Sequence, residues 1–128
     1  MRKCEHMRRN EGIIYEMHAE MCRIFTHAAR LKIIDLLGRG EMSVSALTKS
    51  VGLNRPTVSQ HLAVLRDRGV VRTRRKGTTI YYRIADDRII TACLTMRTVL
   101  LDRVKATGDI ASAVRRPQTP RRNRRRKR

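Results

Sequence analysis

The chain has few aromatic and few acidic side chains. Of its 128 residues, 3% are aromatic, with one Phe and no Trp, whereas 41% are hydrophobic. A core of this composition has to be aliphatic, which favours helices packed by Leu, Ile and Val over a β-sandwich. The length suffices for one domain and is too short for two ordinary ones.

Long apolar runs are also missing. No run approaches the roughly 20 residues of a membrane span, and the first residues, MRKCEHMRRNEG, lack the apolar centre of a signal peptide. We therefore expect a cytoplasmic protein that does not contact a membrane. In a reducing cytosol, Cys4, Cys22 and Cys93 are expected to be free thiols or ligands rather than a disulfide framework.

The sequence also lacks the motifs of common enzymes. There is no Gly-rich phosphate loop, no pair of carboxylates in a plausible cleft, and no Cys–His pair with a scaffold to orient it. We therefore predict that the chain is not an enzyme and requires no cofactor.

Basic residues are abundant. The chain has 30 Lys and Arg against 11 Asp and Glu, so its net charge is +19 and its pI about 11.5. Such an excess favours a polyanionic partner, nucleic acid before all others. Nine of the basic residues and no acid lie within residues 115–128, where prolines and charge repulsion predict disorder. We predict a flexible N-terminus (1–11), a folded domain (12–107) and a disordered basic tail (108–128).

The apolar spacing predicts a mainly helical fold with one small hairpin. Helices are expected over 13–25, 28–37, 46–50 and 55–68, and a last helix from Asp86 or Asp87 to residue 106. A short edge strand is expected at 42–44, with Ser45 as the N-cap of the third helix and Asn54 as the N-cap of the fourth. The segment VVRTRRKGTTIYYRIA alternates around Gly77, which is typical of a β-hairpin.

The third and fourth helices, joined by VGLN, form a helix-turn-helix pattern. At 100° per residue, one face of the fourth helix is apolar and predicted to be buried: Val58, Leu62 and Leu65. The opposite face carries small or hydrogen-bonding residues suited to base edges in the major groove, with Ser59 and His61 on its flanks: Pro56, Thr57, Gln60, Ala63 and Val64. A solvated face with an incidental Gln is the alternative for this helix alone.

The hairpin that follows is strongly basic. Arg and Lys residues surround its base and first strand, with one acid, Asp67, among them. This pattern suits a wing that contacts phosphates, so the segment as a whole predicts a winged helix that binds double-stranded DNA. The predicted DNA contacts are Arg55, Thr57, Ser59, Gln60, His61, Arg66, Arg74, Arg75, Lys76 and Thr78. The last helix is apolar over much of its surface, which favours a helical dimer interface.

Three motifs resemble the ArsR/SmtB family of prokaryotic winged-helix repressors. They are R-L-x-I-x-x-L-L, VSQHLAVLRDRGVV and R-x-G-T-x-x-Y-Y-R-I, and the resemblance covers roughly residues 22–103. It implies a winged helix-turn-helix with four helices ahead of or around a short strand and wing, then a fifth helix. It also implies a homodimer through the first and last helices, a palindromic operator, and repression until an inducer acts. Ser59, Gln60 and His61 match the family's recognition-helix signature.

The metal sites of the family have no counterpart here. Metal-sensing members often have Glu-Leu-Cys-Val-Cys-Asp-Leu where this chain has EMSVSAL at 41–47. Serine hydroxyls are poor ligands for a soft metal, since they do not ionise as a metal-bound thiol does. The family's second site, on the last helix, needs histidines, and no His follows His61.

The remaining candidate effector site is made of thiols. Cys22 and Cys93 lie on the two helices expected to pack together, so oxidation, reactive sulfur or arsenite could join them, with Cys4 as a third thiolate for arsenite. Two alternatives stay open: small buried apolar cysteines, or a transition-metal site at His18 and Cys22. A non-sensing architectural DNA-binding protein is the competing function, favoured by the basic tail.

Overall fold

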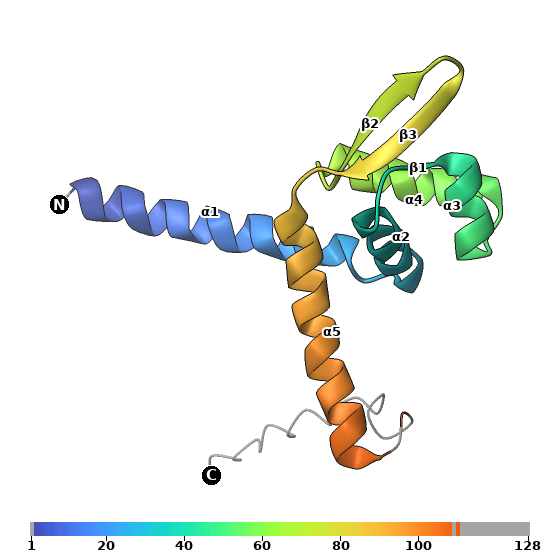
Figure 1. The fold of residues 1–128 in the computed structure, drawn as a ribbon. Helices are drawn as coiled ribbons and strands as arrows, with labels where there is room; N and C mark the ends of the chain where they lie inside the picture. The colour runs from blue at the N-terminus through green and yellow to red at the C-terminus, as the bar shows by residue number, and fades with distance from the viewer. Residues whose placement is uncertain (1, 109, 111–128) are drawn as a thin grey trace, which may run out of the picture. The chain divides into compact units, whose positions relative to one another are not determined.

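The computed structural model describes residues 2–108 and 110, with side chains from residue 10 onward. Its elements follow the predicted order, and Figure 1 shows them along the chain. They are α1 (Arg2–Ile24), α2 (Ala28–Gly38), β1 (Met42–Ser43), α3 (Val44–Val51), α4 (Arg55–Asp67), β2 (Val71–Lys76), β3 (Thr79–Ile84) and α5 (Asp87–Thr107).

The chain divides into two compact units, residues 1–93 and residues 94–128. The first holds α1 to α4, the sheet and the first two turns of α5. The second contains the rest of α5, which is helical to Thr107.

The first unit is a helix-turn-helix with a wing. Helix α4 packs against α2 and α3, and β2 follows α4 directly. The three strands are antiparallel in the order β1-β3-β2. Strands β2 and β3 pair from Val71–Ile84 to Lys76–Thr79, which leaves a two-residue turn at Gly77 and Thr78. Gly77 has φ 62°, as the first position of a type II′ hairpin turn requires.

The core is aliphatic throughout, as the composition predicts. Helix α4 contributes its predicted face, because Val58, Leu62 and Leu65 are each 0% exposed. Helices α1, α2 and α3 and the start of the wing complete this core with Ile24, Ile33, Ile34, Leu37, Leu47, Val51, Val70 and Val71. At the edge of the core, the side chain of Ile90 from α5 lies 3.3 Å from where a Cβ on Gly38 would be. A glycine at the end of α2 therefore permits this close approach.

The caps confirm one prediction and correct another. Asn54 caps α4, since its Oδ1 accepts a hydrogen bond of 2.9 Å from the Thr57 N–H. The prediction that Ser45 caps α3 is wrong: Ser43 is the N-cap, and its Oγ accepts from the Ala46 N–H at 3.2 Å. The reason is that β1 contains only two residues, so the chain enters the helix two positions earlier. At α5, Asp86 accepts from the Arg88 N–H at 2.9 Å.

The N-terminus differs from the sequence prediction. Helix α1 begins at Arg2, whereas the apolar stripe predicted a start near residue 13 and a flexible segment before it. Residues 2–11 lack a stripe but are rich in Arg, Glu, Lys and Met, which have high helix propensity. The predicted tail falls almost wholly outside the described residues, and the limits of the predicted domain remain a prediction.

Replacing Leu62 with Ala should destabilise the protein by about 2–5 kcal/mol, because it leaves a cavity in a core that has no aromatic ring to fill it. Denaturant unfolding at a fixed protein concentration measures this loss. The matched control is Leu53→Ala, a leucine 38% exposed between α3 and α4, for which we expect a change under about 1 kcal/mol. Equal losses in the two variants would contradict the assignment of the core.

Candidate nucleic-acid interface

The N-terminal half of α4 presents hydrogen-bonding side chains to solvent. Burial of the apolar face fixes how the helix is rotated, so Arg55, Ser59 and Gln60 are exposed. Thr57 is half-buried, because its backbone N–H is held by the Asn54 cap. Pro56 lies in the first turn, where a missing N–H costs nothing. This arrangement matches a helix that contacts base edges with its first turns.

His61 points partly inward. It is half-buried, and its Nδ1 accepts a hydrogen bond of 3.2 Å from the Arg30 Nε of α2. Its ring centroid lies 5.8 Å from that of His27. Burial, followed by the charges of Arg30 and His27, lowers the pKa of His61 below its usual value. The structure therefore gives this predicted DNA contact an intramolecular partner.

The outer face of the wing is basic. Cross-strand partners lie on the same face of a sheet, and Val71 with its partner Ile84 faces the core. By the period of two, Arg72, Arg74 and Lys76 of β2 lie on the opposite face. Arg83 joins them there, because it is the partner of Arg72. Arg75 and its partner Ile80 lie on the core side, beyond the end of the core, and both are exposed.

Two of these cations were missing from the predicted contacts. Arg72 and Arg83 are exposed on the outer face. The alternation of β3 places Arg83 opposite the face of Tyr82 and Ile84, but only the strand register shows that it lies beside Arg72. Thr78, in the hairpin turn, and Arg66, near the C-terminal end of α4, are exposed as the prediction requires.

An acid lies at the edge of this basic face. Glu41 precedes β1, and its two carboxylate oxygens accept from the Arg74 Nε at 3.1 and 3.2 Å, with a further close contact from Nη2. The Arg74 guanidinium also lies over the Tyr81 ring, with Cζ 5.3 Å from the centroid. The hydrogen bonds from Arg74 lower the pKa of Glu41, and the charges of Arg83 and Lys76 act in the same direction. Glu41 is thus ionised at neutral pH and already holds one predicted phosphate contact.

The candidate thiols differ in exposure. Cys22 is exposed near the end of α1, whereas Cys93 is half-buried against the core, and neither forms a disulfide. The side chain of Cys4 lies outside those described. His18 is exposed one turn before Cys22. Across the described part of the chain, no group of three or more His, Cys, Asp or Glu side chains is placed to hold a metal ion.

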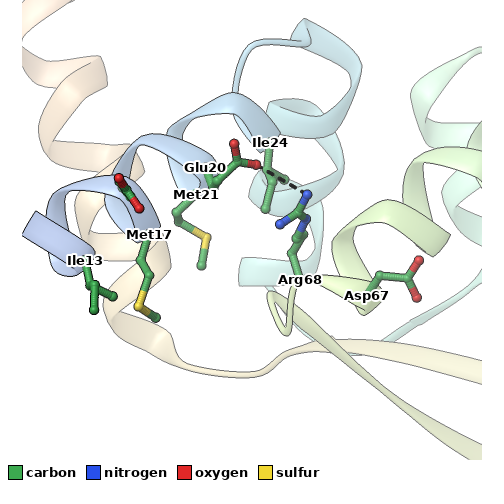
Figure 2. A pocket seen from close by; sticks show the side chains of 8 residues that line it. Ile13, Met17, Glu20, Met21, Ile24, Asp67 and Arg68 are labelled. Carbon is green, nitrogen blue, oxygen red and sulfur yellow. Dashed lines mark ion pairs between the residues drawn. The ribbon is translucent and has the colours of Figure 1, made fainter.

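A cavity of about 460 Å³ lies between α1 and the end of α4 (Figure 2). Figure 2 shows apolar side chains from α1 along it and an ion pair between Glu20 and Arg68. The apolar lining is Ile13, Met17, Met21 and Ile24. Glu20 also pairs with Arg23, so the acid is engaged on both sides. The cavity contains no arrangement of nucleophile and base, and it joins α1 to the helix-turn-helix.

A search of the described helices finds none that is both long and apolar enough to cross a membrane.

Comparison with known proteins identifies the family. Residues 27–73 match the model of the "bacterial regulatory protein, arsR family". The chain is also 38% identical over 102 residues to the uncharacterized HTH-type transcriptional regulator Rv0081 of Mycobacterium tuberculosis, covering 76% of this chain and 90% of that protein. This chain belongs to the ArsR family. The Rv0081 crystal structure superposes with a TM-score of 0.69 at 35% identity, covering 75% of this chain and 97% of that one.

Two further ArsR-family relatives are informative. A biofilm growth-associated repressor of Agrobacterium fabrum is 41% identical over 70 residues, which are 55% of this chain and 60% of the relative. The first curated relatives are thus matched over only 54–60% of their length. The solution structure of a homodimeric winged helix-turn-helix DNA-binding domain, Mb0332 of Mycobacterium bovis, superposes with a TM-score of 0.64 at 32% identity, covering 70% of this chain and 82% of that one.

Replacing Glu41 with Gln should tighten binding to DNA of random sequence. The change removes a negative charge from the basic face and releases Arg74 for a phosphate, so the slope of log affinity against log salt should steepen by up to about 0.9. Anisotropy of a labelled duplex over a salt series measures this slope. Asp35→Asn is the matched control, because Asp35 pairs with Arg39 on α2, away from the wing. Identical slopes for the two variants would contradict the role of Glu41.

Proposed function

We propose that this ArsR-family chain is a transcriptional repressor that binds a palindromic DNA operator as a homodimer and is released by thiol chemistry. The observation that carries the DNA-binding part is the combination of an exposed polar α4 N-terminus with a wing face of four cations. Base edges select the sequence, and phosphates supply most of the affinity.

In this proposal α4 enters the major groove. Gln60 is the residue best suited to discriminate bases, because its amide can bond adenine in a bidentate manner. Arg55, Thr57 and Ser59 surround it on the first turns. The phosphate contacts come from the end of α4 and from the wing: Arg66, Arg72, Arg74, Arg75, Lys76, Thr78 and Arg83.

A second copy of the chain explains the exposed apolar side chains. On α1, Ile14 is 61% and Met17 is 62% exposed, and on α5, Met96 is 63% and Leu101 is 52% exposed. Apolar residues concentrated in this way mark association surfaces. The homodimeric M. bovis relative supports the same assembly. Two copies related by a twofold axis would match a palindromic operator.

The proposed signal acts at Cys22 and Cys93. The exposed Cys22 is accessible to a solute, and both thiols belong to the same compact unit. An oxidant such as a persulfide would join the two sulfurs, accept two electrons and release the two thiol protons. A disulfide would link α1 to α5, the helices that carry the exposed apolar faces. Arsenite would instead need three thiolates, with Cys4 as the third.

Two alternatives remain with this proposal. Cys93 packs on the core, so it can be a small apolar residue with no sensing role. His18 and Cys22 can contribute to a transition-metal site only if further ligands come from elsewhere, such as a second copy.

The second candidate function is an architectural DNA-binding protein. The specific observation that favours it is the charge of the segment 115–128, with nine basic residues and no acid. Such a protein binds all sequences through counterion release. It would show no preference that depends on Gln60.

Selection from a random duplex library should yield a palindromic site, and Gln60→Ala should reduce discrimination against altered bases in it by about 1–3 kcal/mol. Arg72→Ala should instead weaken all sequences alike and reduce the salt slope by about 1. Affinities for the selected and scrambled duplexes over a salt series separate these effects. Failure to select any site, with all duplexes bound alike, would favour the architectural function.

Cys22→Ser and Cys93→Ser should each abolish release of the operator by a persulfide donor, because the disulfide needs both sulfurs. Cys4→Ser should leave this release intact and weaken only release by arsenite, which needs a third thiolate. Anisotropy of the selected duplex, with mass spectrometry of the protein, measures both. Release by both reagents in the Cys22→Ser, Cys93→Ser double variant would refute the thiol signal and leave the DNA-binding proposal standing.

A further inference from the structure

His61 sits among the exposed residues of the recognition helix but is turned toward the junction of α1 and α2. Its neighbour Gln60 is exposed, whereas His61 is half-buried. The rings of His61 and His27 are 5.8 Å apart and inclined by 50°, and His27 is the last residue before α2. The junction therefore contacts α4 one residue away from the side chain best suited to select bases.

Arg30 connects both sides of this contact. Its Nε donates to the His61 Nδ1 at 3.2 Å, and its Nη1 donates at 3.4 Å to the carbonyl oxygen of Ile24, the last residue of α1. Ile24 is only 3% exposed, so that carbonyl belongs to a well-packed residue. One guanidinium thus bridges the end of α1 and the recognition helix.

We propose that Arg30 is a positioning residue for DNA recognition: through His61 it fixes the recognition helix relative to the end of α1. This role rests on the proposed DNA binding by α4. The hydrogen bond uses the lone pair of Nδ1, so it exists only while that nitrogen is unprotonated. A protonated His61 would offer a second donor to the guanidinium, and two cations would face each other.

The role predicts a dependence on pH. The charged and titratable groups facing His61 are Arg30 of α2 and His27 of the junction, and together with burial they lower the pKa of His61 below its usual 6.5. A depressed pKa means that the bond contributes fully above pH 6.5 and is lost as the pH falls toward the lower value of the folded protein. Operator recognition should weaken within that window.

A simple charge effect has the opposite sign. Protonated histidines attract phosphates, so the affinity for random DNA rises as the pH falls. The ratio of the selected-site affinity to the random-site affinity removes this contribution. A fall in that ratio at low pH therefore reports the position of the recognition helix, which general attraction to DNA does not affect.

The experiment measures this ratio by anisotropy for the full chain between about pH 8 and about pH 6, the range in which histidines titrate. We expect the wild-type ratio to fall about fivefold, the value of one ordinary hydrogen bond. Arg30→Met should show the reduced ratio already at the higher pH, with little further change. Arg39→Met is the matched control: it removes the same charge from an exposed arginine that immediately follows α2 and should follow the wild-type curve.

His61→Asn gives a second, independent measurement. The Asn Oδ1 can accept in place of Nδ1 and does not titrate, so its ratio should not change with pH. A wild-type pH dependence in either Arg30→Met or His61→Asn would overturn the proposal, and the asparagine variant decides the question should Arg30→Met fail to fold by circular dichroism. Absence of any selected site in the wild type would instead overturn the proposed repressor function.

Discussion

The burial of one face of α4 is the constraint on which the rest of the molecule depends. Val58, Leu62 and Leu65 are fully enclosed by aliphatic neighbours, so the helix cannot rotate about its axis without exposing them. The opposite face is fixed toward solvent as a consequence. The same burial continues into Val70 and Val71, and the Val70 N–H bonds the Leu65 carbonyl at 2.9 Å. The wing therefore starts at a defined place beside the recognition helix.

Acidic side chains are few, and several are held by arginines. Glu20, Asp35, Glu41 and Asp86 all form ion pairs with Arg. The hydrogen bonds from Arg88 lower the pKa of Asp86 to about 2, so this N-terminal cap of α5 stays ionised across the physiological range. These pairs are exposed, and each adds little to stability. Their larger effect is on the surface, where they determine which arginines are already oriented by a partner.

Local signals made much of this fold predictable. The buried face of α4, the Asn54 cap and the Gly77 hairpin each depend on residues close in sequence, and all appear as expected. The start of α1 was missed because a charged segment has no apolar stripe to mark it. Ser43 replaces Ser45 as a cap because only pairing with β3 decides where β1 ends. Such pairing is a tertiary fact.

The site was predictable in type but not in its internal contacts. The sequence predicts a basic wing and a polar recognition helix, because both follow from composition on a known period. It does not show that Glu41 holds Arg74, 33 residues away, or that Arg30 reaches His61, 31 residues away. Those contacts require the packing of α2 against α4 and of β1 against β3. They are also the contacts that assign specific roles to side chains which composition treats alike.

The tyrosines have a consequence for spectroscopy. The chain has three Tyr and no Trp, and two of the three are adjacent on β3. Tyr81 lies on the outer face beneath Arg74, whereas Tyr82 packs against the core. One strand thus carries two intrinsic fluorophores that face opposite environments. In the unlabelled protein, the ultraviolet emission of Tyr82 would follow unfolding, and that of Tyr81 would follow whatever displaces or covers the guanidinium above it.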